Sequence, residues 1–366
     1  MKKLLAAAAS MLPLVVFAHH GHVNQFDSSK IVEVSGVVTN LRFVNPHSYV
    51  EFDVTNAEGE VEAWRCEMRA AYVLKRSGWS EEMFEPGTPI SISGIASRKE
   101  ATGCYIETLA LGEQEAIGRY AQLEENKAEI GAERSAKTSW GVPNLAGDWA
   151  AEQVRPDTSE IPSYLGHPPG MGPDGPLSAG GPPGAGRPTS TLSESGQAAM
   201  ARLVANADEG AGNLDCKPRS FVRDWIADQH TNLIEQDEDK ITLKYGFMDT
   251  VRTVHLDMNE HPKEIEPSFA GHSIGWWQDD VLVVHTTGFD EQLVVAGPRG
   301  PVGATSDQYH VTERFSVDNE AGTLTRSYVA KDPVYWVDGH QESGEQTILL
   351  ADYPWEPYAC EDLAIE

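Results

Sequence analysis

Basic side chains are scarce in this sequence. Its 366 residues include 28 Lys and Arg against 56 Asp and Glu, which gives a formal net charge of −28 at pH 7. A surface this acidic repels polyanions, so nucleic acids and anionic membranes are poor partners. After residue 18, no apolar run approaches the roughly 20 residues that a membrane-spanning helix requires. We therefore expect neither a nucleic-acid partner nor a membrane span.

Several catalytic signatures are also missing. We expect no nucleophile elbow, the strand–turn–helix unit that presents a catalytic serine. There is no His-Glu-x-x-His helix, no Cys-x-x-Cys pair and no glycine loop for phosphates or dinucleotides. The sequence therefore leaves open whether this protein is an enzyme.

The N-terminus has the features of an export signal. Lys2 and Lys3 precede an apolar run, and Val16 and Ala18 are small residues at the positions that a signal peptidase reads. This predicts a signal peptide over 1–18 and a periplasmic or secreted chain that begins at His19.

The chain has four cysteines, an even number that suggests disulfides in an exported protein. Four cysteines allow three pairings. We favour Cys66–Cys104 with Cys216–Cys360, because each bridge then lies within one expected domain.

Residues 19–111 are expected to form an OB-like five-stranded β-barrel. Runs rich in β-branched residues occur at 31–43, 49–54 and 61–68, a helical stretch at 70–77, and two further runs at 89–96 and 105–111. Three strands, a helix and two strands is the order of an OB-type barrel. Residues 112–138 are charged and rich in helix-forming residues, so we expect a helical linker there.

Residues 139–366 are expected to form a second, antiparallel β-barrel. Strand patterns occur at 231–236, 240–247, 250–256, 273–277, 281–287, 309–317, 323–329 and 346–350. About eight strands joined by short turns close into a barrel wide enough for core side chains or one small ligand. The segment 161–188 is so rich in Gly and Pro that we expect an extended insertion.

Each half of the chain carries its own set of motifs. The first half has a paired histidine (His19, His20) and an Asn45-Pro46-His47 motif, and the second has Gly271-His272-Ser273-Ile274-Gly275, Thr312-Glu313-Arg314-Phe315 and Tyr358-Ala359-Cys360-Glu361. With these motifs, residues 19–111 and about 140–361 resemble two families of secreted bacterial proteins without an assigned activity. The second resemblance implies a lipocalin-like barrel. His285 departs from the pattern, in which Asp is usual, so no acidic role is carried over to it.

The stretch 271–285 is expected to form a β-hairpin with a turn at Gln278-Asp279-Asp280. On its first strand His272 and Trp276 share one face and Trp277 lies on the other. One tryptophan would be core and the other free to stack on a ligand. Strand positions further suggest that four polar residues face a shared lumen, namely His272, Arg252, Glu313 and Arg314. An alternative is an internal network in which Arg and Glu satisfy each other.

Three functions follow from these patterns. The first is small-molecule binding, of a glycan or an aromatic compound, in a barrel pocket formed by Arg252, Trp276, Trp277, His285, Glu313 and Arg314. The second is an enzyme, a lyase, isomerase or cyclase that uses His272 as general acid or base. The third is copper binding by His19, His20 and His22, with His47 completing the site, because a terminal amine beside imidazoles chelates Cu(II). The oligomeric state is not predicted.

Overall fold

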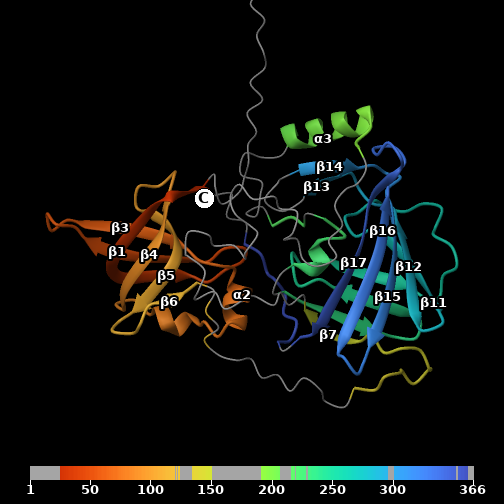
Figure 1. Cartoon of the computed structure of the whole chain (residues 1–366), viewed down its shortest axis with the longest axis horizontal. Coiled ribbons are helices and arrows are strands. Elements are labelled where there is room, and N and C mark those ends of the chain that lie inside the picture. The colour runs from red at the N-terminus through yellow and green to blue at the C-terminus, as the bar shows by residue number, and fades with distance from the viewer. Residues whose placement is uncertain are drawn as a thin grey trace, which may run out of the picture.

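The computed structural model describes residues 25–119, 121, 123, 134–150, 191–206, 216–218, 220–227, 230–295, 301–351 and 353–361. The protein is mainly β, as expected. An N-terminal sheet and a closed C-terminal barrel lie side by side (Figure 1). Among the helices described, none is long and apolar enough to cross a membrane.

The N-terminal unit has the expected order of strands and helix. Its strands are β1 (Phe26–Arg42), β2 (Tyr49–Thr55), β3 (Val61–Glu67), β4 (Pro89–Ser97), β5 (Gly103–Leu111) and β6 (Ile117–Gly118). The helix α2 (Ala71–Arg76) and the 3-10 turn η1 (Glu81–Phe84) lie between β3 and β4. The sheet order is β3-β2-β1-β4-β5-β6, and β3 also pairs in parallel with β5, which closes a five-stranded ring.

A disulfide joins the two strands that close this ring. Cys66 of β3 lies opposite Cys104 of β5, with their Cα atoms 4.5 Å apart. Both cysteines belong to the core beneath the sheet. At the neighbouring bulge, a Cβ on Gly94 would lie 2.7 Å from the carbonyl oxygen of Tyr105. Gly94 is therefore required there because the two backbones approach too closely for a side chain.

The C-terminal unit is a closed barrel of nine strands. In ring order these are β10 (Val251–His255), β11 (His272–Gln278), β12 (Val281–Thr287), β15 (His310–Asp318), β16 (Thr323–Lys331), β17 (His340–Leu350), β7 (Gly147–Ala150), β8 (Thr231–Gln236) and β9 (Lys240–Lys244). Outside the ring, the hairpin of β13 (Gln292–Val295) and β14 (Pro301–Thr305) carries the helix α3 (Glu194–Asn206) (Figure 1).

One strand pair differs from the expected antiparallel meander. β10 and β11 run parallel, with Val254 opposite Ser273 and His255 opposite Ile274. Parallel neighbours cannot be joined by a tight turn, since the chain must return to the end where it started. Residues 256–271 make this return, and they bring His261 to the outside of the barrel wall.

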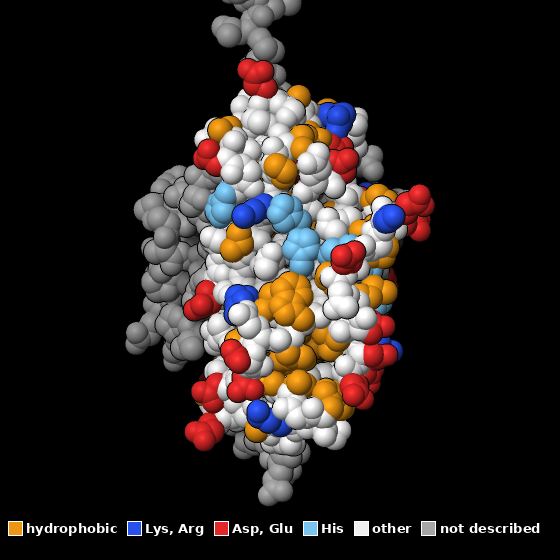
Figure 2. All heavy atoms as spheres, turned by 90° about the vertical axis from the view of Figure 1, so that its right-hand side faces the viewer, with side chains coloured by type: hydrophobic (Ala, Val, Ile, Leu, Met, Phe, Trp, Pro, Cys, Tyr) orange, Lys and Arg blue, Asp and Glu red, His pale blue; other side chains and the backbone are white. Residues whose placement is uncertain are grey.

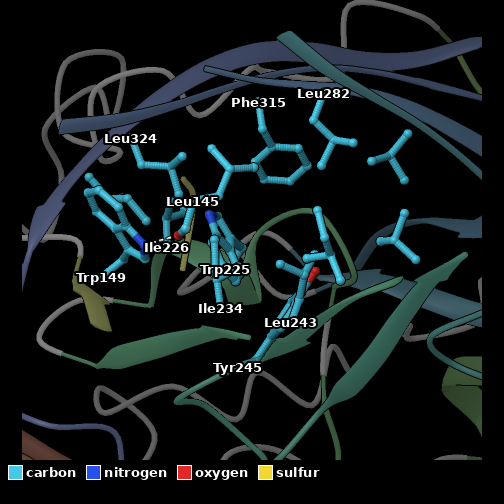
Figure 3. Close-up of a cluster of buried hydrophobic side chains, with 14 residues drawn as sticks. Leu145, Trp149, Trp225, Ile226, Ile234, Leu243, Tyr245, Leu282, Phe315 and Leu324 are labelled. Carbon is cyan, nitrogen blue, oxygen red and sulfur yellow. Dashed lines mark hydrogen bonds between the residues drawn. The ribbon is translucent and has the colours of Figure 1, made fainter. Parts of the chain in front are cut away.

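A short segment of the chain occupies the barrel interior. This plug, residues 220–226, includes the 3-10 turn η4 (Asp224–Ile226). Its Trp225 and Ile226 join the main core cluster (Figure 3). Inward-facing side chains hold its backbone: Arg326 donates to the Val222 carbonyl at 2.8 Å, and Asn232 donates to the Trp225 carbonyl at 2.7 Å. The lumen is thus packed with the protein's own side chains.

The two units are in contact through the Asn-Pro-His turn. The Asn45 side chain donates to the Tyr358 carbonyl and accepts from the Tyr72 amide at 3.0 Å. The Glu361 amide donates to the Asn45 carbonyl at 2.7 Å. Around these bonds a shared apolar cluster forms from Ala70, Tyr72, Val73, Met248 and Tyr358. Asn45 therefore anchors the C-terminal tail of the barrel to the first unit.

The predicted disulfides are confirmed, whereas the linker differs from expectation. Cys216 bonds to Cys360 with Cα atoms 5.5 Å apart, and no cysteine is free. Within the expected helical linker, residues 117–118 form β6 against β5, because this edge of the sheet still offers unpaired backbone groups. Residues 124–133, the insertion 161–188 and the predicted signal peptide lie outside the described residues.

Candidate functional site

One face of the hairpin of β11 and β12 lies inside the barrel, and the other face lies outside. Ser273 and Trp277 face the interior: Ser273 is buried, and Trp277 packs on the main core. His272 and Trp276 face outward, and Trp276 is 48% exposed. The two tryptophans lie on opposite faces as predicted, with Trp277 packed on the core and Trp276 open to solvent.

The expected shared lumen is wrong for His272 and Arg314. Neighbouring residues of a strand point to opposite sides, so Glu313 and Arg314 cannot both face inward. Arg252 and Glu313 are buried inside the barrel, whereas Arg314 lies outside and donates to Gln278 at 3.1 Å. His285 faces outward with His272. The proposed pocket residues therefore divide into an interior set and an outer set.

The interior set forms the internal network considered as an alternative. Glu313 accepts from Arg252 Nη2 at 2.5 Å and from Arg326 Nε at 2.7 Å, and all three side chains are buried. Burial by itself raises the pKa of Glu313, but the two guanidinium groups outweigh it and hold that pKa below its usual value. Glu313 is thus an ionised carboxylate shared by two arginines, and it stabilises the wall around the plug.

Five histidines gather on the outer wall. We call His255, His261, His272, His285 and His310 the histidine cluster. Four come from neighbouring strands, β10, β11, β12 and β15, and His261 comes from the loop that connects β10 to β11. Figure 2 shows histidine side chains in a band across this face, above an apolar patch.

Hydrogen bonds join the three central imidazoles directly. His261 Nδ1 lies 2.9 Å from His272 Nδ1, and His261 Nε2 lies 2.8 Å from His285 Nδ1. A neutral imidazole has one donor and one acceptor nitrogen, so His261 donates to one neighbour and accepts from the other. The three rings form one chain in which each contact is imidazole to imidazole.

The outer two rings extend this chain at both ends. His255 stacks on His272 with ring centroids 5.1 Å apart, and its Nδ1 lies 4.0 Å from a carboxylate oxygen of Asp257. His310 lies beside His285 with centroids 5.7 Å apart. Five rings thus follow one another across four strands.

One apolar side chain lies among the histidines of the two strands. Ile274 lies on the outer face of β11, two residues after His272 and directly opposite His285 of β12. It is only 6% exposed although it faces outward, and its burial stabilises the fold by about 1.5–3 kcal/mol. The contacts with His272 and His285 hold the His261 ring between its two partners.

The surroundings keep these imidazoles neutral. Burial, then His285 and His272, lower the pKa of His261 to about 4. Burial and the adjacent His255 lower the pKa of His272, and burial and His310 lower the pKa of His285. At pH 7 the central rings therefore keep nitrogen lone pairs available for a ligand or a proton.

Ser273 carries no nucleophile function in this arrangement. The letters Gly-x-Ser-x-Gly do occur at 271–275, but the serine lies within β11 and not on a strand-to-helix turn. Its side chain is buried and shares a 2.8 Å hydrogen bond with the Thr286 hydroxyl. A substrate on the outer wall cannot reach it, because the strand lies between them.

The residues of the expected N-terminal metal site are only partly described. His19, His20 and His22 lie outside the described residues. His47 Nδ1 lies 2.6 Å from a carboxylate oxygen of Glu67, and Tyr49 donates to the other oxygen at 3.3 Å. A carboxylate that orients one ring nitrogen leaves the opposite nitrogen directed away from it, as in many metal-bound histidines.

Sequence reasoning missed His255, His261 and His310. His261 falls in Asn-Glu-His-Pro, which has the composition of a turn, and nothing in the local pattern connects it to His272. The parallel pairing of β10 with β11 brings His261 next to His272. The signal available was the position of His255, His272 and His310 at strand ends, since these ends can meet at one edge of a barrel.

Comparison with known proteins gives a family match for part of the chain and no activity. Residues 7–105 match the model of a family of unknown function, DUF6152. The match covers the N-terminal unit as far as the start of β5, including Asn45, His47 and Glu67, and does not reach the barrel. No curated protein matches the chain.

Proposed function

We propose that this chain is an exported protein that binds first-row transition-metal ions on the outer wall of its C-terminal barrel. His261, His272 and His285 are the proposed ligands. One observation carries the proposal: three neutral imidazoles meet nitrogen to nitrogen at 2.8 and 2.9 Å on the surface. Imidazole nitrogen is a preferred ligand of zinc, copper, nickel and iron.

The spacing of the rings suits an ion after a small adjustment. Among the described residues, no three His, Cys, Asp or Glu side chains already converge on one point. Two ligands of a tetrahedral ion, each about 2.0–2.1 Å from it, lie roughly 3.3 Å apart. The contacts in the histidine cluster must therefore open by only about 0.5 Å when a metal ion replaces the shared proton. Rotation of solvent-facing rings supplies this change.

Export and charge fit the same proposal. The two disulfides are compatible with an oxidising compartment, and the predicted signal peptide would deliver the chain there. The formal charge of −28 also raises the local concentration of cations at the surface. Copper was the metal expected from the N-terminal histidines, and the barrel wall offers a second set of imidazoles for it.

Isothermal titration with Cu(II) and Zn(II) tests the proposal. The protein is produced without a tag, with His19, His20 and His22 replaced by Gln so that the tail contributes no imidazole. We expect His261→Gln to weaken binding by more than roughly tenfold, since loss of an outer-shell partner alone costs 10–100-fold. His47→Gln is the matched control in the other unit. Equal metal affinities of the His261→Gln and His47→Gln variants would exclude the barrel wall as the metal site.

Proton transfer by His272 is the second candidate function. The observation in its favour is the hydrogen-bonded chain of imidazoles, which can pass a proton from one ring to the next. Trp276, exposed on the same face, would hold a glycan or aromatic substrate by stacking. Turnover of a substrate found by screening that survives His272→Ala would count against this role.

A further inference from the structure

His261 contacts its two neighbours through different nitrogens. Nδ1 is directed to His272 and Nε2 to His285. These nitrogens lie on opposite sides of the imidazole ring, and their lone pairs diverge. A single ion cannot bind to both, so the geometry provides two separate ion positions, one on each side of His261.

We propose that the histidine cluster holds two transition-metal ions bridged by the His261 ring. One ion lies between His261 Nδ1 and His272 Nδ1, and the other between His261 Nε2 and His285 Nδ1. This inference rests on the proposed function, metal binding at the cluster, and adds the number of ions and the bridge between them.

The flanking histidines match this division. His255 lies against His272 and His310 lies against His285, with ring centroids 5.1 and 5.7 Å apart. Each ion position thus has one further imidazole on its own side, besides the bridge and the Nδ1 ligand. The cluster is arranged around His261 as two similar halves.

Binding of both ions removes one proton from His261. Free His261 is neutral and carries one N–H. The first ion binds its lone pair and displaces a hydrogen bond without changing the charge of the ring. The second ion binds the other nitrogen, and the N–H proton leaves to solvent, so the ring becomes an imidazolate. His272 and His285 bind through Nδ1. The neighbour that donated its Nδ1 proton to His261 in the free chain transfers that proton to its own Nε2 through solvent, and the other neighbour already carries its proton there. Metal binding that releases protons is general for such ligands.

The bridge also fixes the distance between the ions. Bonds of about 2.0–2.1 Å on both sides of one imidazole place the ions roughly 6 Å apart. Two Cu(II) ions joined through an imidazolate couple their unpaired electrons antiferromagnetically. The coupled pair gives a smaller integrated electron paramagnetic resonance signal than two isolated ions.

The experiment combines native mass spectrometry with electron paramagnetic resonance on the Cu(II)-loaded full chain. Gln again replaces His19, His20 and His22. We expect two copper ions per chain and an integrated signal well below the copper content. His272→Gln and His285→Gln should each retain one ion with its full signal, because each removes one side of the bridge. Both replaced side chains face outward and are partly buried, so circular dichroism is used to check that each variant is folded.

The outcomes separate the bridge from the proposed function. One copper ion per chain, or two with a full uncoupled signal, would overturn the bridge and leave metal binding at the cluster in place. If no bound copper ion depends on these three histidines, both the bridge and the proposed function are overturned.

Discussion

Replacing Glu313 by Gln tests whether the buried ionic network stabilises the barrel. The Glu313 carboxylate is shared by Arg252 and Arg326 inside the wall, and all three side chains are buried. Gln has nearly the same size but no charge, so both guanidinium groups lose their nearest counter-charge without a large change in packing. The replacement therefore isolates the electrostatic part of the interaction.

The expected loss is large because the remaining charges stay buried. Removing one partner of a buried ionic network costs about 3–5 kcal/mol in the free energy of unfolding. At about 2–4 °C per kcal/mol for a domain of this size, the melting temperature should fall by roughly 6–20 °C. Glu235→Gln is the matched control. Glu235 pairs with Lys244 at 2.8 Å on the outside of the barrel and is half exposed, so its loss should cost less than about 1 kcal/mol.

The pH dependence gives a second readout of the same carboxylate. Because the pKa of Glu313 is lower in the folded chain than its usual value of 4.5, its contribution is fully present above that value. The contribution is lost as the pH falls below 4.5 towards the folded pKa. Glu313→Gln should therefore lose less stability between pH 7 and the acid range than the unmodified protein.

Urea unfolding followed by tryptophan fluorescence measures both effects, since Trp149 and Trp225 are buried in the barrel. If Glu313→Gln costs no more than Glu235→Gln at pH 7, the network does not stabilise the barrel, and the reasoning from buried charge is wrong.

Three further predictions concern the unit interface, the covalent bridge and the outer wall. Asn45→Ala should cost about 1–3 kcal/mol, because it leaves buried backbone groups unpaired; an unchanged urea midpoint would contradict this. Replacing both Cys216 and Cys360 by Ser should cost about 2–5 kcal/mol through the lost cross-link, and an unaltered melting temperature would exclude that contribution. Trp277→Ala should lower the melting temperature clearly more than Trp276→Ala, because only Trp277 packs on the core; equal shifts would contradict the assigned faces.

Local patterns predicted the individual strands well. The expected strands 231–236 and 281–287 have the bounds observed for β8 and β12, because alternation and turn residues are local signals. The hairpin at 271–285 and both disulfides also followed from the sequence. Alternation placed Trp276 and Trp277 on opposite faces, but it could not say which face was inside.

Features that depend on distant partners were not predicted. The parallel pairing of β10 with β11 is set by how the barrel closes, and no local pattern reports it. The same holds for His261, whose partners lie 11 and 24 residues further along the chain. The plug was also missed, since Phe221, Val222, Trp225 and Ile226 form too short an apolar stretch to show a period.

The Cys216–Cys360 bridge turns most of the barrel into a covalent ring. Every barrel strand except β7 lies between these two residues, and so does the plug. A single cut by a protease anywhere inside this ring leaves both fragments attached to each other until the bridge is reduced. The bridge also ties the chain just before the plug to the tail held by Asn45. Proteolytic cleavage in the exposed loops of this barrel can therefore break the chain without releasing any strand.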